Sequence, residues 1–504
     1  MTVKGLYTKM EGLRFPYLNR ARDAARITIP GLIPEDGHSS STVLPTPYQG
    51  VGARGVNNLS SALLLSLLPP NAPFFRLVLG PEAKKEIEGL PEVETEVETS
   101  LSEMERTVMQ EIETGSVRVA TFEALKHLVV AGNILIHFPD EGGMRVFHLD
   151  RYVVKRDPMG NVQKIVVKET VAHDLLPKEI QDQLPDKEGD VCDIYTCVET
   201  VKNGKTEVFQ EVGGMILENT RGTYAKDMSP WLALRMSRID GEDYGRGYVE
   251  EYQGDLNSLE ALSQAIVEGT AASAKVLFMV NPNGTTRARS IARAPNGGIV
   301  EGNANDVSTL QVQKYNDFRV ALETIAQIRE RLNYAFMLTE ASIRHAERVT
   351  AEEIRLVTQS IERQLGGIYS VLSQEFQLPL VKILMSRMGK KGMLPKLPKN
   401  FVTPMVITGI EGLGRGNDLN KLDSFVAGIG QILGPEVMSQ FIDVREYLNR
   451  RATSLGLDTK GLIKTEEELA MEAQNAQMAQ MAQTLGPDAI KAGTEMSKEA
   501  INNG

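Results

Sequence analysis

The chain has 504 residues, of which 42% are hydrophobic and 24% are charged, and its formal net charge is −11. This length exceeds that of one compact unit, so two to four structural regions are expected. The composition is ordinary for a globular protein. The longest apolar run, Ala62 to Leu68, is too short to span a membrane, the N-terminus lacks a signal-peptide pattern, and no cluster of Lys and Arg of the kind that grips DNA dominates the sequence.

The first 240 residues combine helix and strand patterns. Apolar residues spaced three and four apart predict a helix over Arg54 to Leu68, and a second, acidic helix is predicted over Glu92 to Glu113. Between Ile134 and Val212, short β-rich runs alternate with Gly, Asn, Asp and Pro turn signals. The expected strands are Ile134–Phe138, Val162–Val167, Cys192–Val201 and Glu207–Val212. This part of the chain is therefore predicted to be an α+β block.

Two long amphipathic helices are predicted in the centre of the chain. One apolar stripe consists of Val249, Tyr252, Leu256, Leu259, Leu262 and Ile266, and the other of Tyr315, Phe318, Leu322, Ile325, Ile328 and Leu332. About 23 residues at 1.5 Å each span roughly 35 Å, so the two helices could run antiparallel over the same length. Between them, Lys275 to Val312 contains three or four strand-like runs with Asn-Gly turns. Pattern alone indicates a helical hairpin with a small β insertion.

A charged loop and a new helix are predicted after the second stripe. Thr350 and Glu353 have the spacing of a capping box, so a helix should begin near Ala351 and continue to Met388. Interruptions are expected at Gly366-Gly367 and at Pro379, either of which can kink a helix. Residues 401–410 have a strand pattern that would return the chain to the α+β block, and helical patterns follow towards the C-terminus.

No pattern for catalysis or metal binding is found. The segment Gly50–Gly55 matches a GxGxxG dinucleotide fingerprint, but residues 44–47 before it are not a strand pattern, so the βαβ context is missing. There is no GxxxxGK[ST] loop, and the six histidines lack HExxH or paired metal spacing. Cys192 and Cys197 alone do not make a disulfide framework and are predicted to be unlinked strand residues. We therefore expect no enzyme, no cofactor and no metal.

Three segments carry a resemblance to a known family. They are RFPYLNRARDAARITIPGLIP (residues 14–34), YQGVGARGVNNLSSALLLSLLPPNAPFFRL (48–77) and AERVTAEEIR (346–355). They resemble the portal proteins, or head-to-tail connectors, of short-tailed (podovirus-type) double-stranded-DNA bacteriophages. In that family the third segment corresponds to a region where a tunnel loop projects into the DNA passage, and the order helix, β module, helix corresponds to stem, clip and stem.

The resemblance implies an α+β portal fold assembled as a ring, with an α+β wing, a helical stem, a small β-rich clip and a helical C-terminal crown. The implied assignment is wing for residues 1–245 and 351–415, stem helices for 246–274 and 313–337, clip for 275–312, tunnel loop for 338–350, and crown with C-terminal helices for 416–504. A net acidic chain suits such a conduit, because an acidic wall repels phosphate and keeps a moving duplex from sticking.

The function implied by the resemblance is a dodecameric channel at one capsid vertex, through which double-stranded DNA is packaged and later ejected. The terminase large subunit would dock during packaging, and the tail adaptor protein afterwards. Other implied partners are the major capsid protein, the scaffolding protein and internal core or ejection proteins, with no membrane partner. The protein would nucleate head assembly and would lie in the virion, and in the host cytoplasm during assembly.

Two groups of basic residues are candidate contacts. The tunnel-loop candidates, expected to face DNA, are Arg344, His345 and Arg348. The clip candidates, expected to contact acidic partners or DNA, are Arg287, Arg289 and Arg293. Ordinary ion pairs with nearby glutamates are the alternative for the first group, and solvated surface arginines are the alternative for the second.

Two other classes of protein stay open. A nucleotide-binding enzyme would use the Gly50–Gly55 loop, and nucleotide binding would reveal it. A helical scaffold would need heptads over several more turns than either apolar stripe provides. Neither class accounts for the three segments that carry the resemblance.

Overall fold

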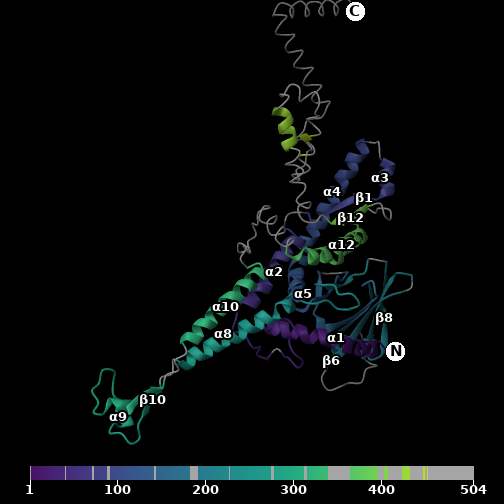
Figure 1. The fold of residues 1–504 in the computed structure, drawn as a ribbon. Coiled ribbons are helices and arrows are strands. Elements are labelled where there is room, and N and C mark those ends of the chain that lie inside the picture. The colour runs from purple at the N-terminus through teal and green to yellow at the C-terminus, as the bar shows by residue number, and fades with distance from the viewer. Residues whose placement is uncertain are drawn as a thin grey trace, which may run out of the picture. The chain divides into compact units, whose positions relative to one another are not determined.

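The computed structural model describes residues 2–39, 41–70, 73–87, 91–140, 143–176, 178–181, 191–201, 203–225, 228–273, 277–310, 315–338, 364–394, 402–406, 423–431, 447–448 and 451 (Figure 1). The chain divides into two compact units, Met1–Gly412 and Leu413–Gly504. In the second unit the Tyr447 hydroxyl donates to the Asp423 carboxylate at 2.6 Å. None of the described helices is both long and apolar enough to cross a membrane.

In the first unit, the N-terminal helix packs on a five-stranded antiparallel sheet, so that the two form a helix layer over a sheet layer. The strands pair in chain order: β4 (Tyr152–Arg156), β5 (Val162–Ala172), β6 (Val191–Thr200), β7 (Thr206–Val212) and β8 (Met215–Tyr224). Helix α1 (Val3–Arg26) packs its N-terminal half on this sheet through Val3, Tyr7 and Met10. Cys197 lies in the same buried cluster and Cys192 is also free, as predicted.

The start of α1 is held by an acidic residue from the sheet. The Glu211 carboxylate on β7 accepts from the backbone amides of Val3 at 2.7 Å and Lys4 at 3.2 Å. Helix α1 has no acidic residue in its own first turn. Glu211 therefore satisfies two amides that have no partner within the helix and places negative charge at the positive end of its dipole.

A second, three-stranded sheet joins the helical core. Strand β2 (Asn133–His137) lies between β3 (Arg145–Phe147) and β9 (Trp231–Arg235), and helix α5 (Val117–Ala131) leads into it through Gly132. Gly132 has a positive φ of 72°, and a β-carbon there would lie 2.2 Å from the Arg246 carbonyl carbon. Only glycine allows this close crossing of two backbone segments.

The largest apolar cluster takes residues from several helices, from β1 and from the three-stranded sheet. Its helices include α1, α2 (Val51–Leu67), α4 (Pro91–Thr114) and α5, and the short α3 (Pro81–Ile87) lies beside β1. Strand β1 (Phe75–Leu79) pairs antiparallel with β12 (Val402–Val406), which confirms the strand predicted over residues 401–410 and brings the late part of this unit back to its beginning. The predicted helices over Arg54–Leu68 and Glu92–Glu113 are confirmed as α2 and α4.

The two apolar stripes form a pair of packed helices (Figure 1). The single turn α7 (Tyr248–Glu251) leads into α8 (Gln253–Ser273), which packs beside α10 (Tyr315–Ala335), and both long helices have 21 residues. An ion pair between Asp255 and Arg331 at one end and a close approach of Gly269 to Phe318 at the other show that they run antiparallel, as predicted. The stripe residues Leu256 and Leu332 are fully buried, but Leu322 is 54% exposed.

The described residues 277–310, between these helices, contain fewer strands than predicted. Strands β10 (Leu277–Val280) and β11 (Val307–Leu310) pair antiparallel, and the six-residue helix α9 (Ala288–Arg293) lies between them. The prediction of three or four strands is wrong because residues 288–293 combine Ala and Arg, which favour helix, and lack alternating β-branched residues.

Residues 364–394 form an interrupted helix. It contains a π-helical turn, Ser373–Gln377, directly before α12 (Leu378–Lys390). Pro379 cannot donate a backbone hydrogen bond and its ring crowds the carbonyl four residues earlier, so the wide turn accommodates it. The predicted irregularity at Pro379 is confirmed, but the interruption predicted at Gly366-Gly367 is wrong, because the helix continues through both residues. The predicted helix start near Ala351 and the capping box at Thr350 and Glu353 lie outside the described residues.

Replacing Glu211 by Ala should destabilise the attachment of α1 by about 1–2 kcal/mol, because two helix amides lose their partner. Hydrogen exchange of the first turn of α1 should become faster, and the thermal unfolding temperature should fall. Glu207, exposed on the same strand, is the matched control, and Glu207→Ala should change neither quantity. Equal exchange in both variants would show that Glu211 does not hold the helix.

Candidate functional site at the junction of helices α2, α8 and α10

The glycine-rich segment Gly50–Gly55 begins helix α2 and does not form a phosphate-binding turn. Residues 43–48 before it are not a strand. The Gln49 side chain accepts from the Gly52 amide at 2.8 Å and donates to the Ile27 carbonyl at 2.7 Å. A β-carbon at Gly52 would lie 2.7 Å from the same carbonyl oxygen. Gly52 is therefore required by the close packing of α2 on the end of α1.

Gly55 provides the contact between α2 and the second long helix. A β-carbon at Gly55 would lie 2.6 Å from the ring of Phe336, which is fully buried just after α10. The preceding loop is attached to the first long helix, because the Glu260 carboxylate on α8 accepts from the amides of Tyr48 and Gln49 at 2.8 and 3.1 Å. Packing thus accounts for the spacing that resembles a dinucleotide fingerprint, and the nucleotide-binding alternative loses its basis.

Asn58 on α2 holds the end of α10. Its side-chain amide donates to the carbonyls of Phe336 at 3.0 Å and Met337 at 3.1 Å. Met337 has a left-handed φ of 56°, and the Leu338 amide donates to the Asn333 carbonyl at 2.8 Å, a geometry typical of a Schellman helix ending. A left-handed conformation costs a residue other than glycine about 1–2 kcal/mol. The bonds from Asn58 help to hold this ending, so α2 fixes where the chain leaves the helix.

The other end of α2 is held by three side chains from distant elements. The Tyr369 hydroxyl donates to the Ser66 carbonyl at 3.3 Å, and the Gln377 amide donates to the Leu67 carbonyl at 2.6 Å. Arg118 donates to the carbonyl of Leu68. These bonds satisfy carbonyls that have no partner within α2 and connect it to α5 and to residues 364–394.

Arginines of the segment 14–34 attach α1 to the rest of the unit. Arg14, 2% exposed, donates to the carbonyls of Leu149, Asp150 and Tyr152 at 3.2, 2.6 and 3.2 Å. Arg20 pairs with Glu250 of α7 at 3.2 Å. One resembling segment thus contacts the sheet region at one position and α7 at another.

A cluster of ion pairs surrounds this second position. Arg246 pairs with Glu242 and Glu250, each at 3.0 Å, and the guanidinium of Arg20 lies 4.6 Å from the centre of the Tyr17 ring. Hydrogen bonding to Arg246 lowers the pKa of the Glu242 carboxyl below its usual range, so this carboxyl stays charged at neutral pH. Because these side chains are partly exposed, the two pairs with Glu250 orient α7 more than they stabilise the fold.

The buried histidines are structural. His127 stacks on His148 with ring centres 6.1 Å apart, and His137 stacks on Trp231 at 3.8 Å. Burial lowers the pKa of both His127 and His137 to about 4. They are neutral at pH 7, and protonation opposes the fold as pH falls from about 6.5 towards 4. No group of three His, Cys, Asp or Glu side chains suited to a metal occurs in the described part of the chain.

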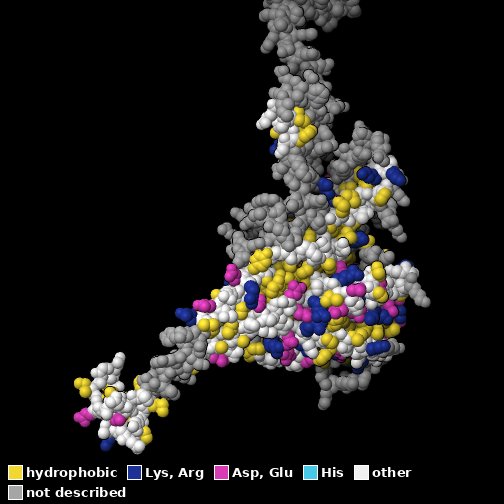
Figure 2. Space-filling view, viewed as in Figure 1, with side chains coloured by type: hydrophobic (Ala, Val, Ile, Leu, Met, Phe, Trp, Pro, Cys, Tyr) yellow, Lys and Arg dark blue, Asp and Glu magenta, His cyan; other side chains and the backbone are white. Residues whose placement is uncertain are grey.

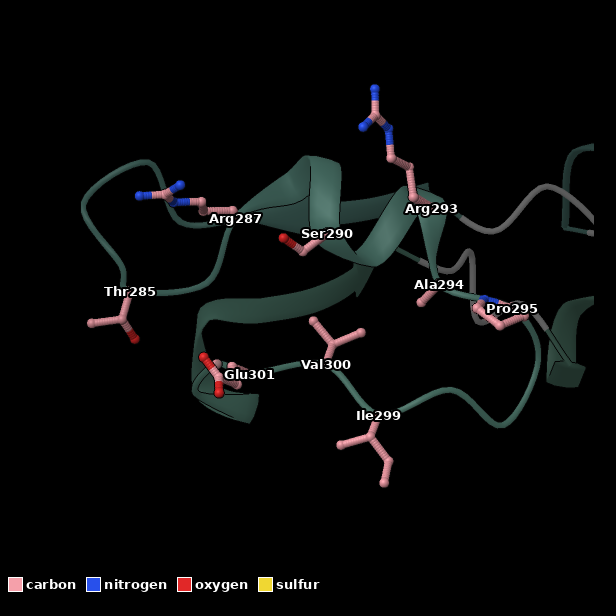
Figure 3. A pocket seen from close by; sticks show the side chains of 10 residues that line it. Thr285, Arg287, Ser290, Arg293, Ala294, Pro295, Ile299, Val300 and Glu301 are labelled. Carbon is pink, nitrogen blue, oxygen red and sulfur yellow. The ribbon is translucent and has the colours of Figure 1, made fainter.

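The predicted clip arginines lie on or beside α9. Arg287 directly precedes α9, and Arg289 and Arg293 belong to it; all three are exposed. Arg287 and Arg293 border an open hollow of about 840 Å³, and Figure 3 shows their side chains extending away from each other at opposite ends of the helix. Arg289 does not line the hollow. The structure therefore brings two of the three predicted residues to one cavity.

The tunnel-loop candidates Arg344, His345 and Arg348 lie outside the described residues. Three residues that hold α2 were not predicted from the sequence: Gln49, which joins it to the end of α1, Asn58, which joins it to the end of α10, and Glu260 of α8. One signal was available for Asn58: asparagine is a poor helix former, so its position inside an apolar helix pattern indicates a specific hydrogen-bonding role.

Comparisons with known proteins agree with one another. Residues 1–463 match the family model described as "Bacteriophage head to tail connecting protein". The portal protein of Escherichia phage T7 is 41% identical over 496 residues, covering 96% of this chain and 91% of that protein. The portal protein of Enterobacteria phage T3 is 40% identical, covering 97% and 92% respectively, and that of Enterobacteria phage SP6 is 29% identical, covering 95% and 93%.

Replacing Gly55 by Ala should separate α2 from Phe336 and destabilise the first unit by about 1–3 kcal/mol, the usual cost of overpacking a core. The measurement is the unfolding midpoint in denaturant. Gly12 in α1 is the matched control, because a β-carbon there would meet nothing within 4 Å. Gly12→Ala should be neutral or stabilising by up to about 1 kcal/mol. Similar effects of the two substitutions would contradict the packing role of Gly55.

Proposed function

The chain belongs to the family of bacteriophage head-to-tail connecting proteins, and we propose that twelve copies form the channel at one capsid vertex through which double-stranded DNA is packaged and later ejected. The observation that carries this proposal is the similarity to portal proteins of three phages over at least 95% of the chain. The α+β fold with its pair of central helices agrees with a portal subunit. The protein supplies the passage and is not the motor.

The partners follow from the same role. During assembly in the host cytoplasm the ring would nucleate head formation with the major capsid protein and the scaffolding protein. The terminase large subunit would then dock and hydrolyse ATP, and the tail adaptor and internal core or ejection proteins would associate in the virion. Double-stranded DNA would be a transient, non-specific partner, because the chain has a net charge of −11 and acidic walls repel phosphate.

Each part of the channel is assigned to a region of the chain. Residues 246–274 and 313–337 would be the stem, and two packed helices of equal length support this assignment. The wing would comprise residues 1–245 and 351–415, supported by the pairing of β1 with β12. Residues 275–312 would be the clip, and residues 416–504 would form the crown and C-terminal helices. The clip residues Arg287, Arg289 and Arg293 would contact acidic partner surfaces or DNA.

The tunnel loop is assigned to residues 338–350. Its support is the ending of α10 at Met337, where Asn58 fixes the last turn, so that the loop would leave the stem from a rigid point. Arg344, His345 and Arg348 would then form a narrow ring of positive charge in an acidic channel. Their contact with phosphate has to be intermittent, because a permanent grip would stall translocation.

The double substitution Arg344→Ala with Arg348→Ala tests whether this ring of charge helps to retain packaged DNA. Rings should assemble and package DNA as before, but filled heads should retain less DNA, by about twofold or more, because two phosphate contacts per copy are lost. The measurement is the DNA content of purified heads after a low-salt wash, with ring symmetry checked by electron microscopy. Removal of two exposed wing arginines, Arg151→Ala with Arg221→Ala, is the control for net charge. Unchanged retention of DNA in the loop variant would contradict the proposed role of the loop arginines.

A further inference from the structure

The chain contains four Asn-Gly pairs, and three of them lie in its described part, at residues 203–204, 283–284 and 296–297. An asparagine followed by glycine can lose its side-chain amide without a catalyst, because glycine has no β-carbon to hinder a close approach. The backbone nitrogen of the glycine attacks the side-chain carbonyl carbon of the asparagine, and its proton leaves with the side-chain nitrogen as ammonia. Water then opens the cyclic imide at either carbonyl, which gives aspartate or isoaspartate.

Two of the three described pairs are held by hydrogen bonds that oppose this attack. The Gly204 amide donates to the Val201 carbonyl at 2.8 Å. The Gly284 amide donates to the Asn281 carbonyl at 3.0 Å. The side-chain oxygen of Asn203 also accepts from the backbone amide two residues later, at 3.1 Å. In both turns the attacking nitrogen therefore has to give up a hydrogen bond before it can react.

The pair Asn296-Gly297 lacks these restraints. Its turn is closed by the Gly298 amide, which donates to the Pro295 carbonyl at 2.9 Å. Among the hydrogen bonds of the described residues, none includes the Gly297 amide or the Asn296 side chain. Residues 295–299 are all exposed, so water reaches the site of reaction. Because a single backbone hydrogen bond spans this turn, little opposes rotation of the peptide unit towards the geometry of attack.

We propose that Asn296 is a site of spontaneous deamidation, at which the module that contains α9 gains one negative charge per copy. Asn296 reacts ahead of Asn203 and Asn283 because its attacking backbone nitrogen and its side chain start without hydrogen bonds to protein. The reaction consumes only water and releases ammonia, so it needs no enzyme and no cofactor.

The new charge alters a module whose own net charge is small. Residues 277–310 contain three arginines and two carboxylates, a net charge of +1, which one further carboxylate cancels. Figure 2 shows few charged side chains on the visible face of this module, at the lower left. Arg293 and Pro295 line the hollow at α9 and lie at the same end of that helix (Figure 3), and Asn296 directly follows. Deamidation therefore places a carboxylate at the end of α9 that carries Arg293.

The consequence for binding rests on the proposed function, in which the clip arginines contact acidic partner surfaces. A carboxylate close to Arg293 repels such a surface, so an aged ring binds the terminase large subunit less tightly than a fresh one. The modification thus limits the period during which an assembled ring can begin packaging.

Incubation of the purified full-length protein at mildly alkaline pH tests the site, with peptide mass spectrometry as the measurement. Asn296 should convert to the acid at least about fivefold faster than Asn203 or Asn283, a factor that corresponds to the net free energy of one hydrogen bond. Cleavage after Arg293 separates Asn296 from Asn283, and enzymatic methylation of isoaspartate should label the Asn296 peptide first. Equal rates at the three asparagines, or a slower rate at Asn296, would overturn the proposal.

The same incubation in denaturant tests whether the structure sets this order. The three asparagines should then react at similar rates, because the hydrogen bonds that protect Asn203 and Asn283 are absent from the unfolded chain. An order that persists in denaturant would show that neighbouring residues determine it, and would contradict the argument from the turns.

A variant that mimics the product separates the modification from the clip assignment. Rings of Asn296→Asp should bind the terminase large subunit about two- to fivefold more weakly than the parent, as expected for one exposed charge. Asn203→Asp, which adds the same charge to an exposed turn of the wing, should leave binding unchanged. Deamidation of Asn296 together with unchanged binding by Asn296→Asp would contradict the role of the clip arginines and leave the modification site standing. Weaker binding by Asn296→Asp without deamidation of the parent would contradict the site and leave the clip assignment standing.

Discussion

The structure depends on the need to satisfy the polar backbone at both ends of the buried helix α2. Its first turn is completed by Gln49, and its last carbonyls receive bonds from Tyr369, Gln377 and Arg118. A buried helix end without such partners would cost about 1–3 kcal/mol for each group left unsatisfied. Because these partners belong to separate elements, α5 and residues 364–394 cannot move far from α2 independently.

Helix α2 also determines the geometry where α8 and α10 pack against it. Gly55 allows Phe336 to approach, Asn58 binds the last carbonyls after α10, and Glu260 of α8 holds the loop before α2. Both long helices are therefore attached to α2, whereas Leu322 on α10 and most described side chains between α8 and α10 are exposed in the single chain.

Periodicity predicted α2, α4, α8 and α10, because apolar side chains that face a core must recur at the period of the helix or strand. Helices α1 and α5 and strands β1, β3, β4, β8 and β9 were not predicted. β3 has only three residues, and the pairing of β8 with β7 is interrupted by a bulge near Gln210. The site residues Gln49, Asn58 and Glu260 were missed for another reason. Their partners lie up to 279 residues away, and no local pattern encodes a hydrogen bond over that separation.

Hydrogen exchange at the end of α10 tests the role of α2 most directly, with Asn58→Ala compared with its neighbour Asn57→Ala. Loss of two hydrogen bonds to Phe336 and Met337 should destabilise the last turn by about 1–2 kcal/mol, which corresponds to roughly five- to thirtyfold faster exchange. We expect this acceleration at residues 333–338 for Asn58→Ala and none for Asn57→Ala. Unchanged exchange in the Asn58 variant would contradict the conclusion that α2 fixes the end of α10.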